Sequence, residues 1–258
     1  MPHGVSWLTF FPGYHQLEAF LRGHFGKSFI GHQEVSAQPV AGAILVFIIV
    51  IVLAIIARTA MKKSTDVLPD EKLTPRNFFE IILEATLGLM KDIIGPEAPR
   101  YFTLIAALAV FILFSNLLGA IPGFTPPTTN LNTTVACALV VFMTYHWVGV
   151  RKQGFFKYFG HMANPVGVWW GWILAPLMFP IEIISNLARP LSLSVRLMGN
   201  MMGDHAVLAI FLGLVPLFVP IPFELLGLLV AVIQTLVFCL LSVVYISLAV
   251  AESDEHGH

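Results

Sequence analysis

The feature that most constrains this chain is a run of eighteen residues without a charged side chain, at positions 40–57. Eighteen helical residues extend about 27 Å at 1.5 Å per residue, which nearly crosses the ~30 Å hydrocarbon core of a bilayer. The whole chain is 57% hydrophobic and only 11% charged, which is far too apolar for an ordinary soluble domain. The sequence therefore predicts an all-α membrane protein.

Further apolar segments follow the first one, and clusters of proline and glycine separate them. We expect membrane-crossing helices within residues 101–121, 133–150, 167–219 and 222–251. Residues 78–94 differ, because apolar side chains recur there at helical spacing among four charged residues. The prediction is one integral membrane domain, residues 1–258, with five membrane-crossing helices, one amphipathic helix and a lead-in segment at 1–38. The last two helices, within residues 167–251, are expected to be long, tilted and paired as a hairpin.

The basic residues indicate how the chain is oriented in the membrane. Seven lie between Arg58 and Arg100 and three between Arg151 and Lys157, while residues 122–132 and 215–222 contain none. Basic loops face the cytoplasm, so we expect the N-terminus and the 1–38 segment outside and the C-terminus inside. A bacterial inner membrane is the default location. With a net charge of −1 and no basic tract, the chain has no electrostatic reason to bind nucleic acid.

A stripe of polar side chains lies in the long segment at 167–219. Its members succeed one another at steps of three or four and occupy a sector about 120° wide on a helix. They are Glu182, Ser185, Arg189, Ser192, Arg196, Asn200 and Asp204. Several charges at membrane depth must be paired, hydrated or used, because each costs at least ~2.5–3.5 kcal/mol on insertion scales. The stripe predicts an ion path; a structural network that seals the bundle is the alternative.

The shape of the helix that carries the stripe is left open by the sequence. As one helix, residues 167–215 would be roughly 70 Å long, about twice what a perpendicular crossing needs. Three prolines, at positions 176, 180 and 190, are able to bend it. Both versions leave residues 182–205 at membrane depth.

A second polar group lies on the other side of the same helix. His205 follows Arg196 by nine residues, so at ~100° per residue the two side chains serve opposite surfaces. The last helix has its own polar strip, and a short connection between the helices would bring Glu224 within reach of His205. A histidine and a carboxylate at similar depth suggest a proton relay.

The string RLMGN at 196–200, preceded by RPLSL at 189–193 and followed by Gln234 and Tyr245, resembles the a subunit of F-type ATP synthases. The resemblance covers nearly the whole chain and includes Asn116, the loop at 126–134 and Glu182. It implies a proton-translocating stator subunit that forms two offset half-channels beside the rotating c-ring and couples proton flow to rotation and ATP synthesis. Such a subunit is not an enzyme by itself and has no nucleotide site, cofactor or metal of its own.

The resemblance also implies roles for individual residues. Arg196 is the partner of the ring carboxylates and the barrier between the half-channels. Asn200 and Gln234 support Arg196, while His205, Glu224 and Asn116 line the outer half-channel, and Glu182 and Tyr245 belong to the inner path. The implied partners are the c-ring, the peripheral-stalk b subunits, the remaining ATP synthase subunits, membrane lipid and protons.

The sequence departs from the family pattern near the outer half-channel. Many bacterial members carry a carboxylate where His205 stands, and their titratable partner in the last helix is often where Gly227 lies here. The histidine and the acid are therefore expected to have exchanged places. Asn130 also stands where members often have an acid, and neither proton nor sodium selectivity follows from this chain, because the ring site largely sets it.

Two other classes of function compete with this interpretation. A secondary transporter would use the same buried residues as its own substrate and proton site, but such folds usually contain internal repeats, and we find none in the sequence. A purely structural membrane scaffold would not need Arg196.

Overall fold

The computed structural model describes residues 7–10, 13–25, 37–63, 75–121, 123–155, 157–158, 160, 171–214 and 220–254. Every regular element within these residues is helical, which confirms the predicted all-α fold. The elements are η1 (Trp7–Phe10), α1 (Tyr14–Phe25), α2 (Gln38–Lys63), α3 (Pro75–Ile94), η2 (Gly95–Glu97), α4 (Ala98–Leu118), η3 (Pro127–Thr129), α5 (Leu131–Gln153), α7 (Gly171–Leu214) and α8 (Pro220–Asp254). Residues 167–170, most of the connection at 215–222 and much of the lead-in segment at 1–38 lie outside the described residues.

Four helical stretches of the described chain are long and apolar enough to cross a membrane. They are Gln38–Ile56, Asn77–Leu118, Leu131–Gln153 and Pro220–Val250. The amphipathic segment predicted at 78–94 forms α3, which belongs to the second stretch and is separated from α4 by the short η2 turn. Gly95 explains why α3 ends before α4, because its φ is +78°, a backbone conformation that glycine adopts more easily than other residues. The charged α7 is not among the four, so the number of five crossings stays a prediction.

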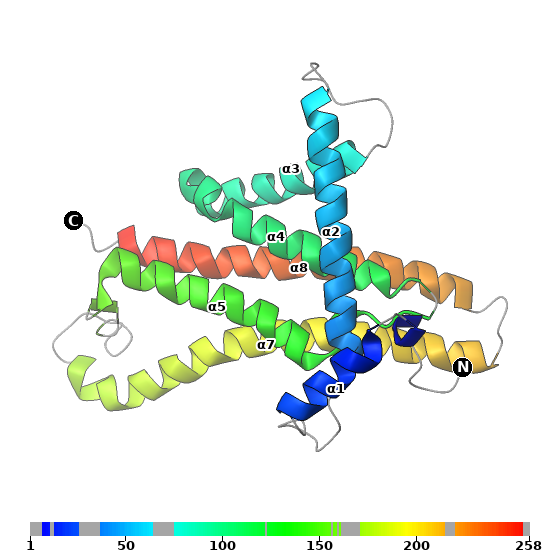
Figure 1. Cartoon of the computed structure of the whole chain (residues 1–258). Helices are drawn as coiled ribbons and strands as arrows, with labels where there is room; N and C mark the ends of the chain where they lie inside the picture. Colours follow the sequence, from blue (N-terminus) through cyan, green and yellow to red (C-terminus); the bar gives the residue numbers. More distant parts are fainter. Residues whose placement is uncertain are drawn as a thin grey trace.

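The long helices lie in two directions. Helix α2 crosses the others steeply, while α4, α5, α7 and α8 extend side by side (Figure 1). Helices α7 and α8 contact each other, as the predicted hairpin requires, and α5 packs against both. Both α7 and α8 are therefore strongly tilted relative to α2, and the polar residues that they carry lie along a wide face of the protein.

Two buried clusters hold this arrangement. The first joins α3, α4, α5 and α8 and includes Met90, Ile105 and Val243. The second joins α4, α5, α7 and α8, and includes Leu197 and Phe238, each with 0% exposure. Because Leu197 is fully buried, the neighbouring Arg196 is turned about 100° away from the core.

Helix α7 is a single helix of 44 residues that contains Pro176, Pro180 and Pro190. It extends about 66 Å at 1.5 Å per residue, and Figure 1 shows it as one continuous, curved helix. Of the two alternatives that the sequence left open, the structure therefore has the single long helix. Each proline lacks the N–H that would close a turn of the helix, which allows the curvature without a loop.

Candidate functional site

Arg196 lies on the outward face of α7. The residue is exposed, while Leu193 and Leu197 on the other side of the helix are buried. No hydrogen bond or ion pair joins Arg196 to another residue that the structure describes. A guanidinium in this position is an unpaired cation, available to an anion outside this chain.

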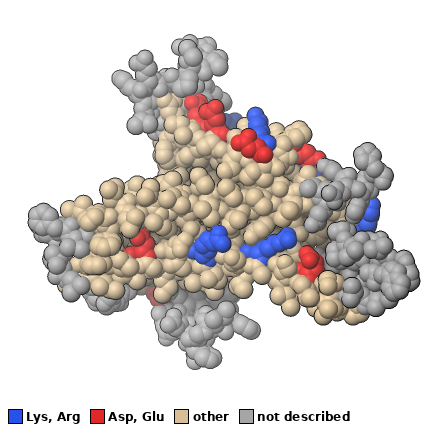
Figure 2. Space-filling view, turned by 180° about the vertical axis from the view of Figure 1, so that it is seen from behind, with Lys and Arg blue, Asp and Glu red and all other residues tan. Residues whose placement is uncertain are grey.

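The surface around Arg196 is apolar. Exposed leucine, isoleucine and valine side chains are frequent along α7 and α8, among them Leu191 at 60% exposure and Val195, next to Arg196 in the chain, at 45%. Figure 2, seen from the side opposite to that of Figure 1, shows basic side chains in the middle of a mostly uncharged face, with acidic side chains on either side. A face of this composition suits lipid or an apolar partner, with one fixed positive charge presented to it.

Asn200 and Gln234 meet beside Arg196, as expected. Asn200 lies one turn after Arg196, and its Nδ2 donates a hydrogen bond of 2.6 Å to Oε1 of Gln234 on α8. Gln234 is buried. This bond joins the two helices at the level of Arg196 and fixes their relative depth there.

The structure also brings together the three residues predicted for the outer half-channel. Asn116, His205 and Glu224 line one pocket between α4, α7 and α8. His205 is half-buried, and the ring lies close to Gly119 at the end of α4. The pocket is on the side of α7 that faces away from the Arg196 surface, as the nine-residue spacing predicted.

Asp204 is a fourth polar residue of this pocket, and its predicted place was wrong. The stripe assigned it to the Arg196 face, but the structure places it in the pocket with His205 and Glu224. Its carboxylate lies against Gly227, where an added Cβ would be 3.1 Å from Asp204 Cγ. The absent side chain at Gly227 was the signal in the sequence, because the carboxylate of Asp204 occupies the space that this glycine leaves on α8.

Asn116 is oriented by residues that the sequence analysis did not single out for that purpose. Thr128, in η3, donates a hydrogen bond of 2.7 Å from Oγ1 to Asn116 Oδ1. With its oxygen occupied, Asn116 directs Nδ2 to α8, at 3.4 Å from the carbonyl oxygen of Ala231 and 3.5 Å from Oγ1 of Thr235. The loop at 126–134 thus determines which end of the Asn116 amide faces α8. The sequence indicated this loop only through the family resemblance.

Replacing Thr128 with valine is expected to destabilise the protein by ~1–3 kcal/mol, because the buried Asn116 oxygen loses its donor while the shape of the side chain is kept. The measurement is the thermal unfolding of the purified complex. Thr144→Val is the matched control, since the Thr144 hydroxyl bonds only the Val140 carbonyl of its own helix. Equal melting temperatures for Thr128→Val and the control would contradict this account of Asn116.

Glu182 and Tyr245 do not touch each other, but a chain of side chains connects them. Asn186 donates to Glu182 Oε1 at 3.2 Å, and its Oδ1 accepts from the Tyr145 hydroxyl at 3.3 Å. Arg189 donates from Nη1 to the Tyr145 hydroxyl at 3.0 Å and lies over the Tyr245 ring. Tyr145 and Asn186 were not predicted from the sequence. Tyr145, on α5, comes close to α7 only through the fold, and Asn186, on α7 itself, has its role only through its contact with Tyr145.

The polar stripe is therefore not one surface. Arg196 and Asn200 are exposed, Arg189 turns inward between α5 and α8, and Asp204 enters the pocket that contains His205 and Glu224. The seven members share one sector of the helix, but long side chains and close neighbours lead them to three different surroundings. A helical sector predicts where Cβ atoms point and leaves the far ends of the side chains undetermined.

Comparisons with known proteins agree with the motifs and the fold. The family described as "ATP synthase A chain" matches residues 42–247. "ATP synthase subunit a" of Sorangium cellulosum is 46% identical over 238 residues, which cover 90% of this chain and 91% of that protein. The protein of the same name from Geobacter sulfurreducens is 44% identical over 220 residues, 85% of this chain and 90% of its own length. That of Bdellovibrio bacteriovorus is 46% identical over 203 residues, 78% and 85% of the two chains.

Proposed function

This chain belongs to the ATP synthase A chain family, and we propose that it is the stator subunit that conducts protons past the rotating c-ring. In this role it forms two offset half-channels, couples proton flow to rotation and is not an enzyme by itself. Its partners are the c-ring, the peripheral-stalk b subunits and the other subunits of the complex.

The observation that carries the proposal is the unpaired Arg196 on an apolar face. A guanidinium keeps its charge even when water is excluded, so it attracts each deprotonated ring carboxylate that passes. At a separation of 4 Å this attraction is worth about 4 kcal/mol at an effective dielectric constant of 20. The same charge repels protons, and it separates a half-channel on one side of it from a half-channel on the other.

The outer half-channel is assigned to the pocket that contains Asn116, Asp204, His205 and Glu224. His205 and the two carboxylates supply groups that bind and release a proton, and Asn116 supplies a fixed dipole. A proton that arrives here binds a ring carboxylate and travels with the ring. Each proton that crosses a potential of 100 mV releases ~2.3 kcal/mol, which drives the rotation.

The inner half-channel is assigned to the region of Glu182, which lies before Arg196 on α7, and of Tyr245, which lies on α8. Asn200 and Gln234, joined at 2.6 Å, support the surroundings of Arg196 between the two paths. The same assignment places the N-terminus outside and the C-terminus in the cytoplasm of a bacterial inner membrane. Residues 1–258 then form one membrane domain with five crossings, in which α7 is the fifth crossing helix beside the four apolar stretches.

Replacing Glu224 with glutamine tests the outer half-channel. The change keeps the size of the side chain and removes the carboxylate, so we expect passive proton conduction to fall several-fold and its dependence on outer pH to change. The loss is partial, because Asp204 remains in the pocket. The measurement uses membrane vesicles from which the catalytic sector has been removed, with a potassium diffusion potential as the driving force.

The control for this experiment is Glu84→Gln, because Glu84 is exposed on α3 and lies outside the pocket. We expect this variant to conduct like the unchanged protein. If Glu224→Gln keeps both the wild-type rate and the wild-type pH dependence, the pocket is not the outer half-channel.

A further inference from the structure

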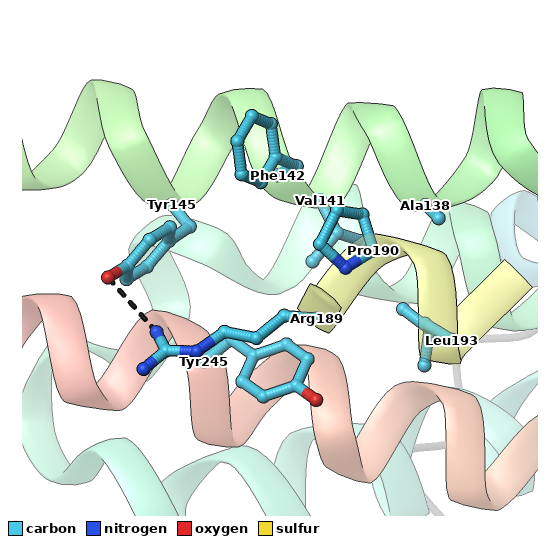
Figure 3. Close-up of a pocket in the computed structure, with 8 residues that line it drawn as sticks. All are labelled: Ala138, Val141, Phe142, Tyr145, Arg189, Pro190, Leu193 and Tyr245. Atoms are coloured by element: carbon cyan, nitrogen blue, oxygen red, sulfur yellow. Dashed lines mark hydrogen bonds between the residues drawn. The ribbon is translucent and has the colours of Figure 1, made fainter. Parts of the chain in front are cut away.

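Helix α7 carries two arginines with opposite surroundings. Arg196 is exposed, whereas Arg189, seven residues earlier, is half-buried and turns toward α5 and α8. The Arg189 Cζ lies 5.4 Å from the centroid of the Tyr145 ring and 5.6 Å from that of the Tyr245 ring. Figure 3 shows the guanidinium at the Tyr145 hydroxyl, with the hydroxyl of Tyr245 pointing away from it.

The two tyrosines come from different helices, so Arg189 connects three. Tyr145 belongs to α5 and Tyr245 to α8, and each ring lies within the ~6 Å at which a ring face attracts a cation. Tyr145 also accepts the 3.0 Å hydrogen bond from Arg189 Nη1. A planar guanidinium suits this position, because it donates in its plane and presents its faces to rings.

The contact is located at Pro190, one of the three prolines inside α7. Pro190 has no N–H, so the carbonyl of Asn186 lacks the hydrogen bond that a helix normally provides. The Asn186 side chain is held at the same turn by Tyr145 and Glu182. Tyr145 of α5 and Tyr245 of α8 thus contact α7 beside a proline, where a helix is able to bend.

The part of α7 beyond this joint carries the functional residues. Arg196 lies seven residues after Arg189, about 10.5 Å farther along the axis at 1.5 Å per residue. A change of angle at Pro190 therefore moves Arg196 across the apolar face. Leu193 and Leu197 are buried on the inner side and limit rotation of the helix, but no hydrogen bond within the described residues holds Arg196 itself.

We propose that Arg189, between the Tyr145 and Tyr245 rings, is a positioning residue that sets the angle of α7 at Pro190 and hence the place at which Arg196 meets the ring. This inference rests on the function proposed for Arg196. In this role the face of the Tyr245 ring matters, and not its hydroxyl, because the ring face contacts Arg189. When the contact is lost, Arg196 shifts and protons pass without driving rotation.

The test compares variants of the whole ATP synthase in inverted membrane vesicles. The measured quantity is the number of protons pumped per ATP hydrolysed, which does not depend on how much complex assembles. We expect Arg189→Gln and Tyr245→Leu to lower this ratio to about half or less, since each removes one partner of the cation–π contact. Tyr245→Phe keeps the ring and is expected to lower the ratio less than Tyr245→Leu does.

Two further variants make the test specific. Arg189→Lys keeps the cation and is expected to recover most of the loss seen with glutamine. The double variant Arg189→Gln, Tyr245→Leu is expected to be no worse than Arg189→Gln alone, because that variant already removes the contact with Tyr245. Lys152→Gln, which breaks the 2.7 Å ion pair with Glu97 at the far end of α5, is the control for a general loss of stability.

The outcomes separate this inference from the proposed function. A Tyr245→Phe variant as impaired as Tyr245→Leu would show that the hydroxyl is needed, and an unchanged ratio in Arg189→Gln would show that the contact positions nothing; either result overturns the inference. The proposed function is tested independently by replacing Arg196, which is expected to abolish coupling whether or not Arg189 is intact.

Discussion

Replacing Arg196 with alanine is expected to abolish proton-driven ATP synthesis while the complex still assembles. The side chain is exposed and makes no contact that the described part of the protein needs for folding, so its removal costs little stability. The ring carboxylate loses its cationic partner, an attraction worth about 4 kcal/mol at 4 Å, or a factor of roughly a thousand in rate. Synthesis is measured in vesicles energised by a pH gradient, together with the amount of assembled complex.

Two further variants show whether the charge itself is responsible. Arg151→Ala removes an exposed arginine at the end of α5 and is expected to leave synthesis unchanged. Arg196→Lys is expected to restore synthesis poorly, because a lysine loses its proton more readily when water is excluded and presents a single ammonium in place of a planar fork. Near-normal synthesis by Arg196→Ala would exclude the half-channel mechanism and favour a structural scaffold.

Replacing Gly119 with alanine is expected to lower proton-driven ATP synthesis at least about tenfold, through the outer pocket. An added Cβ at Gly119 would lie 2.5 Å from Nε2 of His205 and 2.7 Å from Cγ of Pro126, closer than real Cβ atoms approach other atoms. Pro126 is buried and its ring is stiff, so His205 is the group that must change its position in the pocket that it shares with Glu224. One methyl group is thus expected to disconnect the predicted relay.

The matched control is Gly88→Ala in α3, the same chemical change at a helical position with no atom within 4 Å of the added Cβ. It is expected to leave synthesis unchanged and to stabilise the helix slightly, because alanine favours helix over glycine by up to ~1 kcal/mol. If Gly119→Ala synthesises ATP like the control, His205 does not need its position beside Gly119, and the relay through this pocket is wrong.

The sequence was sufficient for the fold class and the family. Uncharged runs such as residues 40–57 have one stable solution in a bilayer, which is a helix, and the structure and the family comparison confirm both predictions. The spacing between Arg196 and His205 was equally informative, because the angle between two residues of one helix depends only on their separation. The placement of Gln234 beside Asn200 followed from the resemblance and is also found in the structure.

The sequence was insufficient where side chains reach beyond their own helix. Asp204 shares a helical sector with Arg196, yet its carboxylate lies against Gly227, since that glycine leaves space on α8. Arg189 shares the sector as well, and its guanidinium turns to two tyrosines that are 44 and 56 residues away in the chain. Pairing between such distant residues depends on how the helices pack, which helical periodicity does not contain.

The sequence by itself determined that this protein is helical, that it belongs in a membrane and that Arg196 and His205 face opposite sides of one helix, because local hydrogen bonding and helix geometry require only neighbouring residues. Only the tertiary structure decided that α7 is one unbroken helix, that Asp204 joins the outer pocket and that Arg189 is held between α5 and α8. These features depend on the space and the partners that other helices provide. Among the charged residues that the structure describes on α7, Arg196 alone is exposed, and this follows as much from the partners of its neighbours as from its own position.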